Sequence, residues 1–523
     1  MKKRSILVTF IILIFILLCV FVSGKFLHKD KQLTFSEKNE DAKFLINFIE
    51  ENYPFLEIKE SLTGYDFLEH KEELIKRISN SKNESEFYLN VYKTIKLLQN
   101  SHTRIANMKE VNDYILGTNF NSVGTEYPFI SSYSNTIDES TSASSQNWDD
   151  VFVNMYYIPD ITCSYVDGKY IVTKSLNEDI NLGDEILQVK GKSVEEYLNE
   201  NIDIYTLYYD FEKEKLFTNK LFVFPNLKKV KSIPVTILSK DNTEKLSKVH
   251  MEKFNLDTYN KLKESKEDNI STRIIEKDNI AYLKINSMND ENNGIEKIKN
   301  FFININGYKN LIIDIRGNGG GGSGGGGSIP DTIISHISKQ PLTVTDYLYF
   351  RQSEYTETFI EKAFKSTKSK ISTSASLPGD NMNGKYIAVE NSVEYSFSKE
   401  NNFDGKVFLL VDYEVYSYSE FFANHVKRLN LATIIGTNTG GDGITVTPHI
   451  NMLPNSKLSF KMSLALGVDD KGNINEKEHT APDYYVEQGI EDSKRALENG
   501  ITDIENTEYD TILNKCISII NGK

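Results

Sequence analysis

The chain has 523 residues, more than one ordinary hydrophobic core accommodates, so we expect roughly two to four domains. Hydrophobic residues make up 39% and charged residues 26% of the sequence, a globular composition that excludes wholesale disorder. The net charge of -14, without a cluster of lysine and arginine that would bind phosphates, argues against a nucleic-acid partner.

Residues 1–28 have the pattern of an export signal or a membrane anchor. Three basic residues, at positions 2 to 4, precede an apolar or small run from Ile6 to Val22. This run is long for the apolar region of a cleaved signal, about 7–15 residues, and slightly short for a membrane span of about 20. Because the basic residues should stay in the cytoplasm, we expect an extracytoplasmic protein, either anchored in the cell membrane with its N-terminus inside or secreted.

Residues 37–106 are expected to form a helical N-terminal domain, since apolar side chains recur along them at helical spacing. This segment ends in QNSHTRI, residues 99–105, where a helix gives way to an extended stretch. The pattern then dissolves over residues 107–160. The Ser/Thr-rich stretch 130–147 within them predicts a variable polar loop without core-forming residues.

Residues 161–250 show short apolar stretches separated by turns, which indicates a β-rich domain. The stretch GDEILQVKGKSV, residues 183–194, resembles the GDxIxxVNGxxV motif of PDZ domains. This resemblance implies a module that binds an extended peptide by adding it as a strand to a sheet edge. A small β domain that binds nothing is the alternative.

Residues 270–500 predict an α/β core. A strand, helix, strand order occurs twice and favours parallel strand pairs, with units at 279–288, 294–305 and 310–316, and at 405–412, 419–429 and 432–439. Two strands of these units are continuously apolar, as strands buried on both faces are.

Ser417 lies between the end of a buried strand and the start of a helix, where backbone N–H groups point toward it. On its own, this serine or Ser419 could simply cap the helix. A second buried strand leads into Asn318, Gly319 and Gly320, and glycine lets a backbone approach a reacting carbonyl closely.

These two strand ends together resemble peptidase family S41, the C-terminal processing and tail-specific proteases with the related tricorn core. The family motifs D-x-R-x-N-G-G-G, S-x-S-E and I-G-x-x-T-x-G are matched by Asp314, Arg316, Asn318, Gly319, Gly320 and Gly321, by Ser417, Ser419 and Glu420, and by Ile435, Gly436, Thr439 and Gly441. The resemblance covers roughly residues 45–486. It implies an α/β multidomain protein with a ClpP/crotonase-like peptidase core that cleaves peptides or proteins by acyl-enzyme chemistry.

The resemblance also distinguishes two ways of activating the serine. The processing-protease branch has a lysine twenty-five residues after the nucleophile, where this chain has Asp442, and an aspartate cannot replace a neutral amine as base. The tricorn-like branch uses a Ser-His-Ser-Glu tetrad, and Ser101 and His102 stand at the expected place. The resemblance then implies Ser417 as nucleophile, His102 as base, and a glutamate acting through Ser101, with Glu476 the candidate and Glu478 the alternative.

By the same resemblance, the backbone N–H groups of Gly319 or Gly320 and of Tyr418 form the oxyanion hole. No cofactor is implied. We expect no metal, because no ligand spacing is shown by four of the other histidines, His336, His425, His449 and His479. Two cysteines distant in sequence, Cys163 and Cys516, could pair in an oxidising compartment or stay unpaired, and the sequence does not decide between these alternatives.

Residues 319–328 read GGGGSGGGGS, a double repeat of a standard flexible linker. We interpret this stretch as an engineered linker that replaces a natural loop, with a native glycine loop as the alternative. Its first glycines also serve the family motif. A flexible loop here is expected to loosen the oxyanion donors.

The sequence thus predicts an extracytoplasmic serine endopeptidase acting on peptides or proteins. The main rival is a catalytically inactive relative that keeps the fold and binds a peptide or another ligand. A third possibility is a peptidase that uses a different lysine, such as Lys461.

Overall fold

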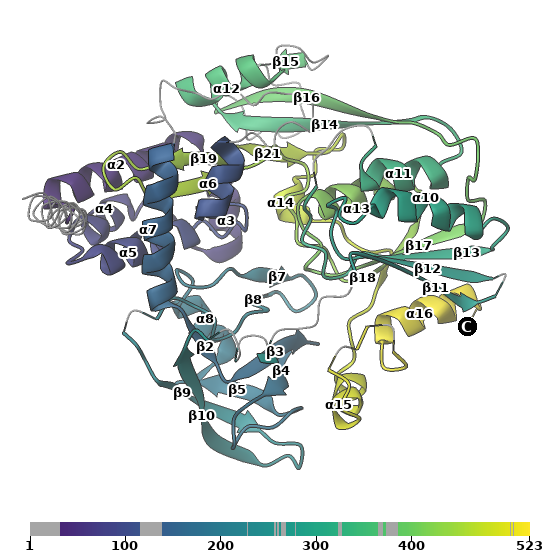
Figure 1. Ribbon diagram of the computed structural model, residues 1–523, viewed down its shortest axis with the longest axis horizontal. Coiled ribbons are helices and arrows are strands. Elements are labelled where there is room, and N and C mark those ends of the chain that lie inside the picture. Colours follow the sequence, from purple (N-terminus) through teal and green to yellow (C-terminus); the bar gives the residue numbers. More distant parts are fainter. Residues whose placement is uncertain are drawn as a thin grey trace, which may run out of the picture.

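The computed structural model describes residues 32–115, 139–226, 228–255, 258, 261–262, 268–277, 279–322, 327–364, 370–372, 385–502, 504–505 and 507–522. It shows a mixed α/β protein with several sheets (Figure 1). The expected export segment, residues 1–28, lies outside this part of the chain. Among the described residues, no helix combines the length and the apolar character that a membrane span requires.

The predicted N-terminal helices are present as α2 (Phe35–Asn52), α3 (Leu56–Thr63), α4 (Lys71–Ser79) and α5 (Glu84–Lys96). A capping box starts α2. There, the Thr34 hydroxyl accepts a hydrogen bond from the Glu37 N–H, and the Glu37 carboxylate accepts one from the Thr34 N–H.

Two further helices, α6 (Met108–Ile115) and α7 (Glu139–Met155), occupy the segment expected to be a loop. The expectation of an irregular structure is therefore wrong for these residues. Trp148 of α7 gives the reason, since its ring packs near Phe87 and Tyr88 of α5 at centroid distances of 5.9 and 6.1 Å. Its Nε1–H also donates to the Ser456 carbonyl at 3.0 Å. One tertiary anchor outweighs the weak local helix preference of the serines and threonines around it.

The next unit is an antiparallel sheet, which we call the β module, together with helix α8 (Val194–Glu200). Its strand order is β2-β10-β9-β5-β4-β3, with β6 paired to β5. The strands are β2 (Tyr157–Pro159), β3 (Ile161–Val166), β4 (Lys169–Ser175), β5 (Glu185–Val189), β6 (Lys192–Ser193), β9 (Ser232–Leu238) and β10 (Glu244–Lys253). A separate hairpin joins β7 (Tyr208–Asp210) to β8 (Lys215–Phe217).

The two predicted strand, helix, strand units are confirmed and form one sheet, which we call the main sheet. Its order is β11-β12-β13-β17-β18-β22, parallel throughout except for the antiparallel edge strand β11. The strands are β11 (Ile270–Glu276), β12 (Ile280–Ile285), β13 (Asn310–Asp314), β17 (Lys406–Val411), β18 (Thr433–Gly436) and β22 (Tyr484–Tyr485).

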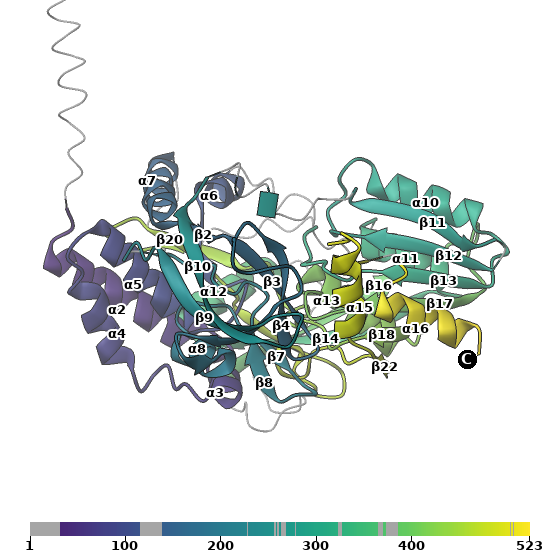
Figure 2. The same ribbon diagram turned by 90° about the horizontal axis from the view of Figure 1, so that it is seen from below.

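Helices cover both faces of the main sheet, which explains why its central strands are apolar without alternation. One face packs against α10 (Gly294–Asn304), α11 (Ile329–Ile337) and α13 (Tyr418–Arg428). The other face packs against α16 (Thr511–Ile520), and α10 and α16 are seen on opposite sides in Figure 2. Cys516, on α16, and Cys163, in the β module, are both buried free thiols, so they do not form a disulfide with each other.

Two smaller sheets join the N-terminal helices to this core. One has the order β15-β16-β14-β21 and the other β1-β20-β19. Their strands are β14 (Leu342–Arg351), β15 (Lys370–Ser372), β16 (Tyr386–Tyr395), β21 (Ala465–Val468), β1 (Arg104–Ile105), β19 (His449–Met452) and β20 (Ser459–Met462). The remaining helices are α12 (Glu354–Phe364), α14 (Asn475–Glu478) and α15 (Ile490–Glu498).

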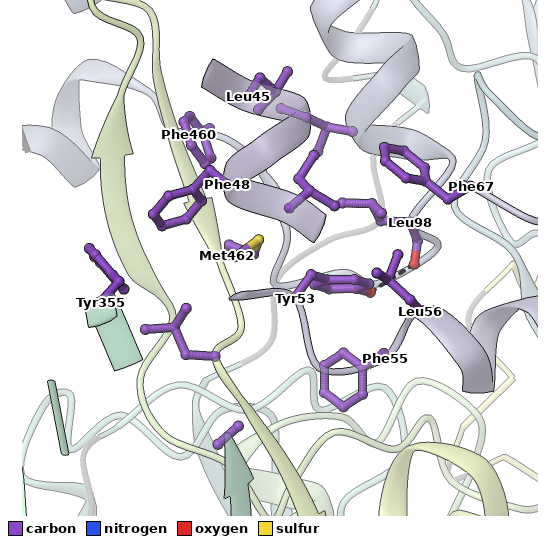
Figure 3. Packing of buried hydrophobic residues seen from close by; sticks show 14 of the residues in the cluster. Leu45, Phe48, Tyr53, Phe55, Leu56, Phe67, Leu98, Tyr355, Phe460 and Met462 are labelled. Carbon is purple, nitrogen blue, oxygen red and sulfur yellow. Dashed lines mark hydrogen bonds between the residues drawn. The ribbon is translucent and has the colours of Figure 1, made fainter. Parts of the chain in front are cut away.

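The N-terminal helices share one hydrophobic core with these two sheets (Figure 3). The ring of Phe48, on α2, lies edge-on to Tyr355 at 4.9 Å and to Phe460 at 5.7 Å between centroids. Behind this contact, the Tyr53 hydroxyl donates to the Leu98 carbonyl at 2.8 Å. The helices are therefore packed onto the rest of the chain rather than around a core of their own.

A buried ion network ties the C-terminal helix to the main sheet. Arg316, at the end of β13, donates two parallel hydrogen bonds to Asp510, at 2.9 and 2.8 Å, and also binds Asp314. Asp510 is the N-cap of α16, where its carboxylate accepts the Leu513 N–H. All three charged side chains are buried, so removal of one weakens the charge compensation of those that remain.

We predict that Asp510→Asn destabilises the protein by about 3–5 kcal/mol, because asparagine keeps the helix cap but removes one of the two carboxylates that pair with the buried Arg316. Urea unfolding followed by circular dichroism measures the change. The matched control is Asp404→Asn, which removes an exposed ion pair with Lys339 and should change stability by less than about 1 kcal/mol. Equal effects of the two substitutions would contradict the role of the buried network.

Candidate active site

Ser417 stands at a strained turn between β17 and α13. Its backbone has φ 60° and ψ -127°, a conformation that residues with a side chain rarely adopt. Although Ser417 is the N-cap residue of α13, its side chain makes no capping hydrogen bond. The hydroxyl is thus directed away from the helix, and the alternative of a merely capping serine does not apply to this residue.

His102 comes from the N-terminal side of the chain and lies against Ser417. Its Nε2 atom is 2.8 Å from the Ser417 hydroxyl oxygen, although the two residues are 315 positions apart. The chain reaches this place because α5 ends shortly before it, and the next residues, Arg104 and Ile105, pair with β20. The ring of Tyr416 contacts the imidazole at 4.8 Å between centroids.

Asp442 binds the other nitrogen of His102. Its Oδ2 atom lies 2.7 Å from Nδ1, so the ionised carboxylate accepts the Nδ1 proton and leaves Nε2 free to accept from Ser417. The same oxygen accepts hydrogen bonds from Asn100 at 2.8 Å and from Ser463 at 3.1 Å. Ser417, His102 and Asp442 therefore form a continuous chain of hydrogen bonds.

Electrostatics keep Asp442 ionised. Burial alone would raise its pKa, since the residue is only 2% exposed. The charge of His102 and the hydrogen bonds from His102, Asn100 and Ser463 outweigh burial, and they hold the pKa of Asp442 below its usual value. A carboxylate that stays charged can orient the histidine and stabilise its protonated form.

This arrangement corrects the expected relay through Ser101. The structure places Asp442, not Ser101, at Nδ1 of His102, and no hydrogen bond among the described residues joins Ser101 to His102 or to Glu476. From the sequence, Asp442 marks only the absence of the lysine of the processing-protease branch. The signal that could have identified Asp442 is chemical. An aspartate cannot replace lysine as the base, but a carboxylate in this turn can orient a histidine that acts as the base.

Glu476 lies one step behind Asp442. Asn100 Nδ2 donates to both carboxylates, to Glu476 at 3.1 Å, and Lys59 forms an ion pair with Glu476 at 2.5 Å. Burial raises the pKa of Glu476 to about 7 against the effect of Lys59, and the charge of Asp442 adds to the rise. The alternative residue Glu478 is exposed, so of the two candidates only Glu476 belongs to this buried cluster.

The glycine-rich loop after β13 approaches the nucleophile closely. The N–H of Gly320 donates to the Asn318 side chain at 3.0 Å, and the same oxygen accepts from the Ser419 hydroxyl at 2.6 Å. Within the described residues, the N–H groups of Gly319 and Tyr418 have no acceptor. Of the expected oxyanion donors, these two are free to bind a ligand oxygen, whereas the donor of Gly320 is occupied.

Glycine is sterically required at several positions of the expected linker. A Cβ atom on Gly320, whose φ is 98°, would lie 2.8 Å from the Ser417 Cβ, and one on Gly322 would lie 2.4 Å from the Met288 carbonyl oxygen. At the other end, Ser328 caps α11 through a capping box with Asp331. Positions 323–326 lie outside the described residues, and the engineered origin of the linker stays a prediction.

His425 and Lys461 have partners of their own away from Ser417. Among the described residues, no group of three or more His, Cys, Asp and Glu side chains is arranged to hold a metal ion. His425 is fully buried between Asp346, at 2.9 Å, and the Tyr395 hydroxyl, at 2.6 Å. Lys461, the alternative lysine base, forms an ion pair with Glu110 at 2.8 Å.

Three solved structures align with this chain at low sequence identity, and the first two, with TM-scores above 0.5, share its fold. Mature CPAF complexed with lactacystin aligns with a TM-score of 0.57 and 13% identity, over 94% of this chain and 99% of that chain. Mature CPAF gives 0.56 and 14%, over 94% and 98%. The photosystem II D1 C-terminal processing protease gives 0.37 and 12%, over 90% and 98%. No curated protein sequence matches the chain.

The family comparison supports a serine-type peptidase as the class of this protein. Residues 279–486 match the model of peptidase family S41. The segment contains Ser417, Asp442 and Glu476, whereas His102 lies before it. The match does not extend to residues 161–250, so the PDZ-like module remains a prediction.

We predict that Gly320→Ala slows the reaction of Ser417 with a fluorophosphonate probe at least about 100-fold, because the added methyl group displaces the nucleophile. Gly327→Ala is a matched control, since Gly327 has a similar φ of 96° but open space around its Cβ position. The control should react at nearly the rate of the parent protein. Equal loss in both variants would mean that backbone strain, and not the contact with Ser417, is responsible.

A second prediction concerns Glu420, which is fully buried in the first turn of α13. Burial raises its pKa to about 7, although Asn475 and Thr480 donate to Oε1. Among the described residues, Oε2 has no hydrogen-bond partner. A raised pKa means that the folded state holds the proton more tightly. Glu420 therefore contributes stability below about pH 4.5, and this contribution is lost as the pH rises toward 7.

The substitution Glu420→Gln should remove this loss and raise the stability at pH 8, relative to the parent protein, by up to about 3 kcal/mol. Urea unfolding at pH 5 and pH 8 tests it. A pH dependence that is the same in the variant and in the parent protein would show that Glu420 does not carry it.

Proposed function

We propose that this protein is an extracytoplasmic serine endopeptidase in which Ser417 is the nucleophile, His102 the general base and Asp442 the carboxylate that orients the base. The observation that carries this proposal is the hydrogen-bonded chain from the Ser417 hydroxyl through both nitrogens of His102 to Asp442. Its distances, 2.8 and 2.7 Å, lie within the range that proton transfer between a nucleophile and its base requires.

The reaction begins when the Ser417 oxygen attacks the carbonyl carbon of the scissile peptide bond and its proton passes to His102 Nε2. The negative charge that develops on the carbonyl oxygen is stabilised by the free N–H groups of Gly319 and Tyr418. Asp442 remains ionised and balances the positive charge of the imidazolium, consistent with its lowered pKa.

The tetrahedral intermediate then collapses. The C–N bond breaks, the leaving amine takes the proton from His102 Nε2, and the acyl group stays on the Ser417 oxygen. A water molecule then gives a proton to the same nitrogen and attacks the ester carbon. The C–O bond to Ser417 breaks, the Ser417 oxygen takes the proton from Nε2, and the acyl product leaves as a carboxylic acid. Two segments distant in sequence thus supply the base and the nucleophile for both half-reactions.

The match of residues 279–486 to the S41 model favours peptides or proteins as substrates. We place the enzyme outside the cytoplasm because basic residues at positions 2 to 4 precede the apolar run from Ile6 to Val22. The protein then acts either anchored by this segment or after secretion. A PDZ-like β module would present extended peptide ends to the site by strand addition.

We predict that Ser417→Ala abolishes both fluorophosphonate labelling and peptide hydrolysis, and that His102→Ala reduces kcat by about 10³-fold or more. Asp442→Asn should reduce kcat by about 10⁴-fold with little change in KM, because the wrong tautomer of His102 is then stabilised. Circular dichroism of each variant shows whether its fold is retained.

The matched control for Asp442→Asn is Glu476→Gln, which changes the neighbouring carboxylate but leaves both hydrogen bonds of His102 in place. It should reduce kcat by no more than about 10-fold. A larger loss with Glu476→Gln than with Asp442→Asn would assign the orienting role to Glu476. A parent protein that neither labels nor hydrolyses peptides would favour the rival proposal of a binding protein that retains the fold.

A further inference from the structure

A cavity of about 260 Å³ lies apart from the Ser417–His102 pair, between the β module and the carboxyl ends of the main-sheet strands. Its walls come from β3 and β4, from the β7–β8 hairpin, from the loop after β17, and from the C-terminal residues beyond β22. Neither Ser417 nor His102 lines it. A volume of this size is below that of a typical site for a drug-sized ligand, and it suits a single side chain or a small amine.

One wall of this cavity is aromatic. The ring of Tyr165 is stacked on Phe217 with 4.0 Å between centroids, and Tyr413 meets Phe217 edge-on at 4.8 Å. The ammonium group of Lys215 already lies 5.6 Å from the centroid of Tyr165, as expected for an aromatic cluster that stabilises a neighbouring cation.

Most of the carboxylates around the cavity are balanced by the protein itself. Lys213 contacts three of them, with Nζ distances of 2.5 Å to Glu487, 3.3 Å to Asp167 and 3.6 Å to Asp210. Glu505 is paired with Lys284 at 2.5 Å. Two further carboxylates, Asp412 and Glu414, line the inner part of the cavity after the end of β17.

Asp412, in this inner part, forms no salt bridge among the described residues, although the charges of Lys284 and Arg316 act on it from further away. Its carboxylate accepts the Gly317 N–H at 3.0 and 3.1 Å and the Glu414 N–H at 3.0 Å, both from neutral backbone groups. Arg316 also lines the cavity, but its guanidinium is bound to Asp314 and Asp510. Burial, followed by the negative charge of Glu414, raises the pKa of Asp412 to about 6. Asp412 is thus a partly buried acid beside a second acid, and a bound cation would stabilise its ionised form.

We propose that this cavity binds an alkylammonium or guanidinium group, as carried by lysine or arginine side chains, with Asp412 as the ion-pair partner and Tyr165, Phe217 and Tyr413 as the aromatic wall. The aromatic faces and the carboxylate converge on one small space, which is the combination that recognises organic cations. This binding site is separate from the proposed peptidase reaction and does not depend on it.

Isothermal titration calorimetry with the intact protein tests the proposal. The probes are Nα-acetyl-arginine amide, Nα-acetyl-lysine amide and the neutral isostere Nα-acetyl-citrulline amide. We expect the two cations to bind at least about 10-fold more tightly than citrulline amide, and binding to weaken as the salt concentration rises. Equal affinity for the charged and neutral probes, or no binding of any of them at millimolar concentration, would overturn the proposal.

Variants locate the site. Asp412→Asn should weaken the binding of arginine amide at least about 10-fold, whereas Asp241→Asn, in an exposed turn of the β module, should leave it unchanged. Ser417→Ala should also leave it unchanged, and a loss in this variant would place the cation in the active site instead. Because Asp412 holds Gly317 and its substitution can disturb the fold, Glu414→Gln provides a second test. It keeps an acceptor for Asn219, and unchanged binding in both acid variants would reject the site.

Discussion

The pairing of β1 with β20 is the contact on which the candidate site depends. It consists of only two residue pairs, Arg104 with Lys461 and Ile105 with Phe460, yet it fixes the chain directly after His102. Behind it, the hydrophobic core around Phe48 holds the N-terminal helices against the same strand. The base is therefore positioned by packing that lies outside the segment matching the S41 model. Because small displacements of a catalytic group cost much rate, this short ladder has a large effect on function.

The residue at position 442 decides which chemistry this site can use. A neutral lysine would act on a serine directly as a base, whereas an ionised aspartate can act only through a partner that carries a proton. His102 is that partner. The charge of Asp442 is maintained by several donors on one oxygen, and Glu476 is kept from competing for His102 because Lys59 and Asn100 hold it in the layer behind.

The sequence was sufficient for the elements of the main sheet, because strands buried on both faces are continuously apolar and the helices between them are periodic. It also indicated Ser417 and His102 as partners, since the family resemblance joins motifs that no periodicity could connect. It did not identify Asp442 as the partner of His102. The contact between Asp442 and His102 depends on the conformation of the turn at Gly441 and Asp442, whose φ values are 85° and 49°. It missed α7 as well, because Trp148 anchors that helix through contacts far away in sequence.

The separation of the reacting residues along the chain has a consequence for biosynthesis. On the proposed mechanism the base is made early, the nucleophile follows 315 residues later, and the orienting carboxylate is 340 residues after the base. Proteins are synthesised from the N-terminus, so a growing or truncated chain that ends before residue 442 lacks part of the machinery. On this mechanism, peptide-bond hydrolysis requires the chain to be made and folded through residue 442.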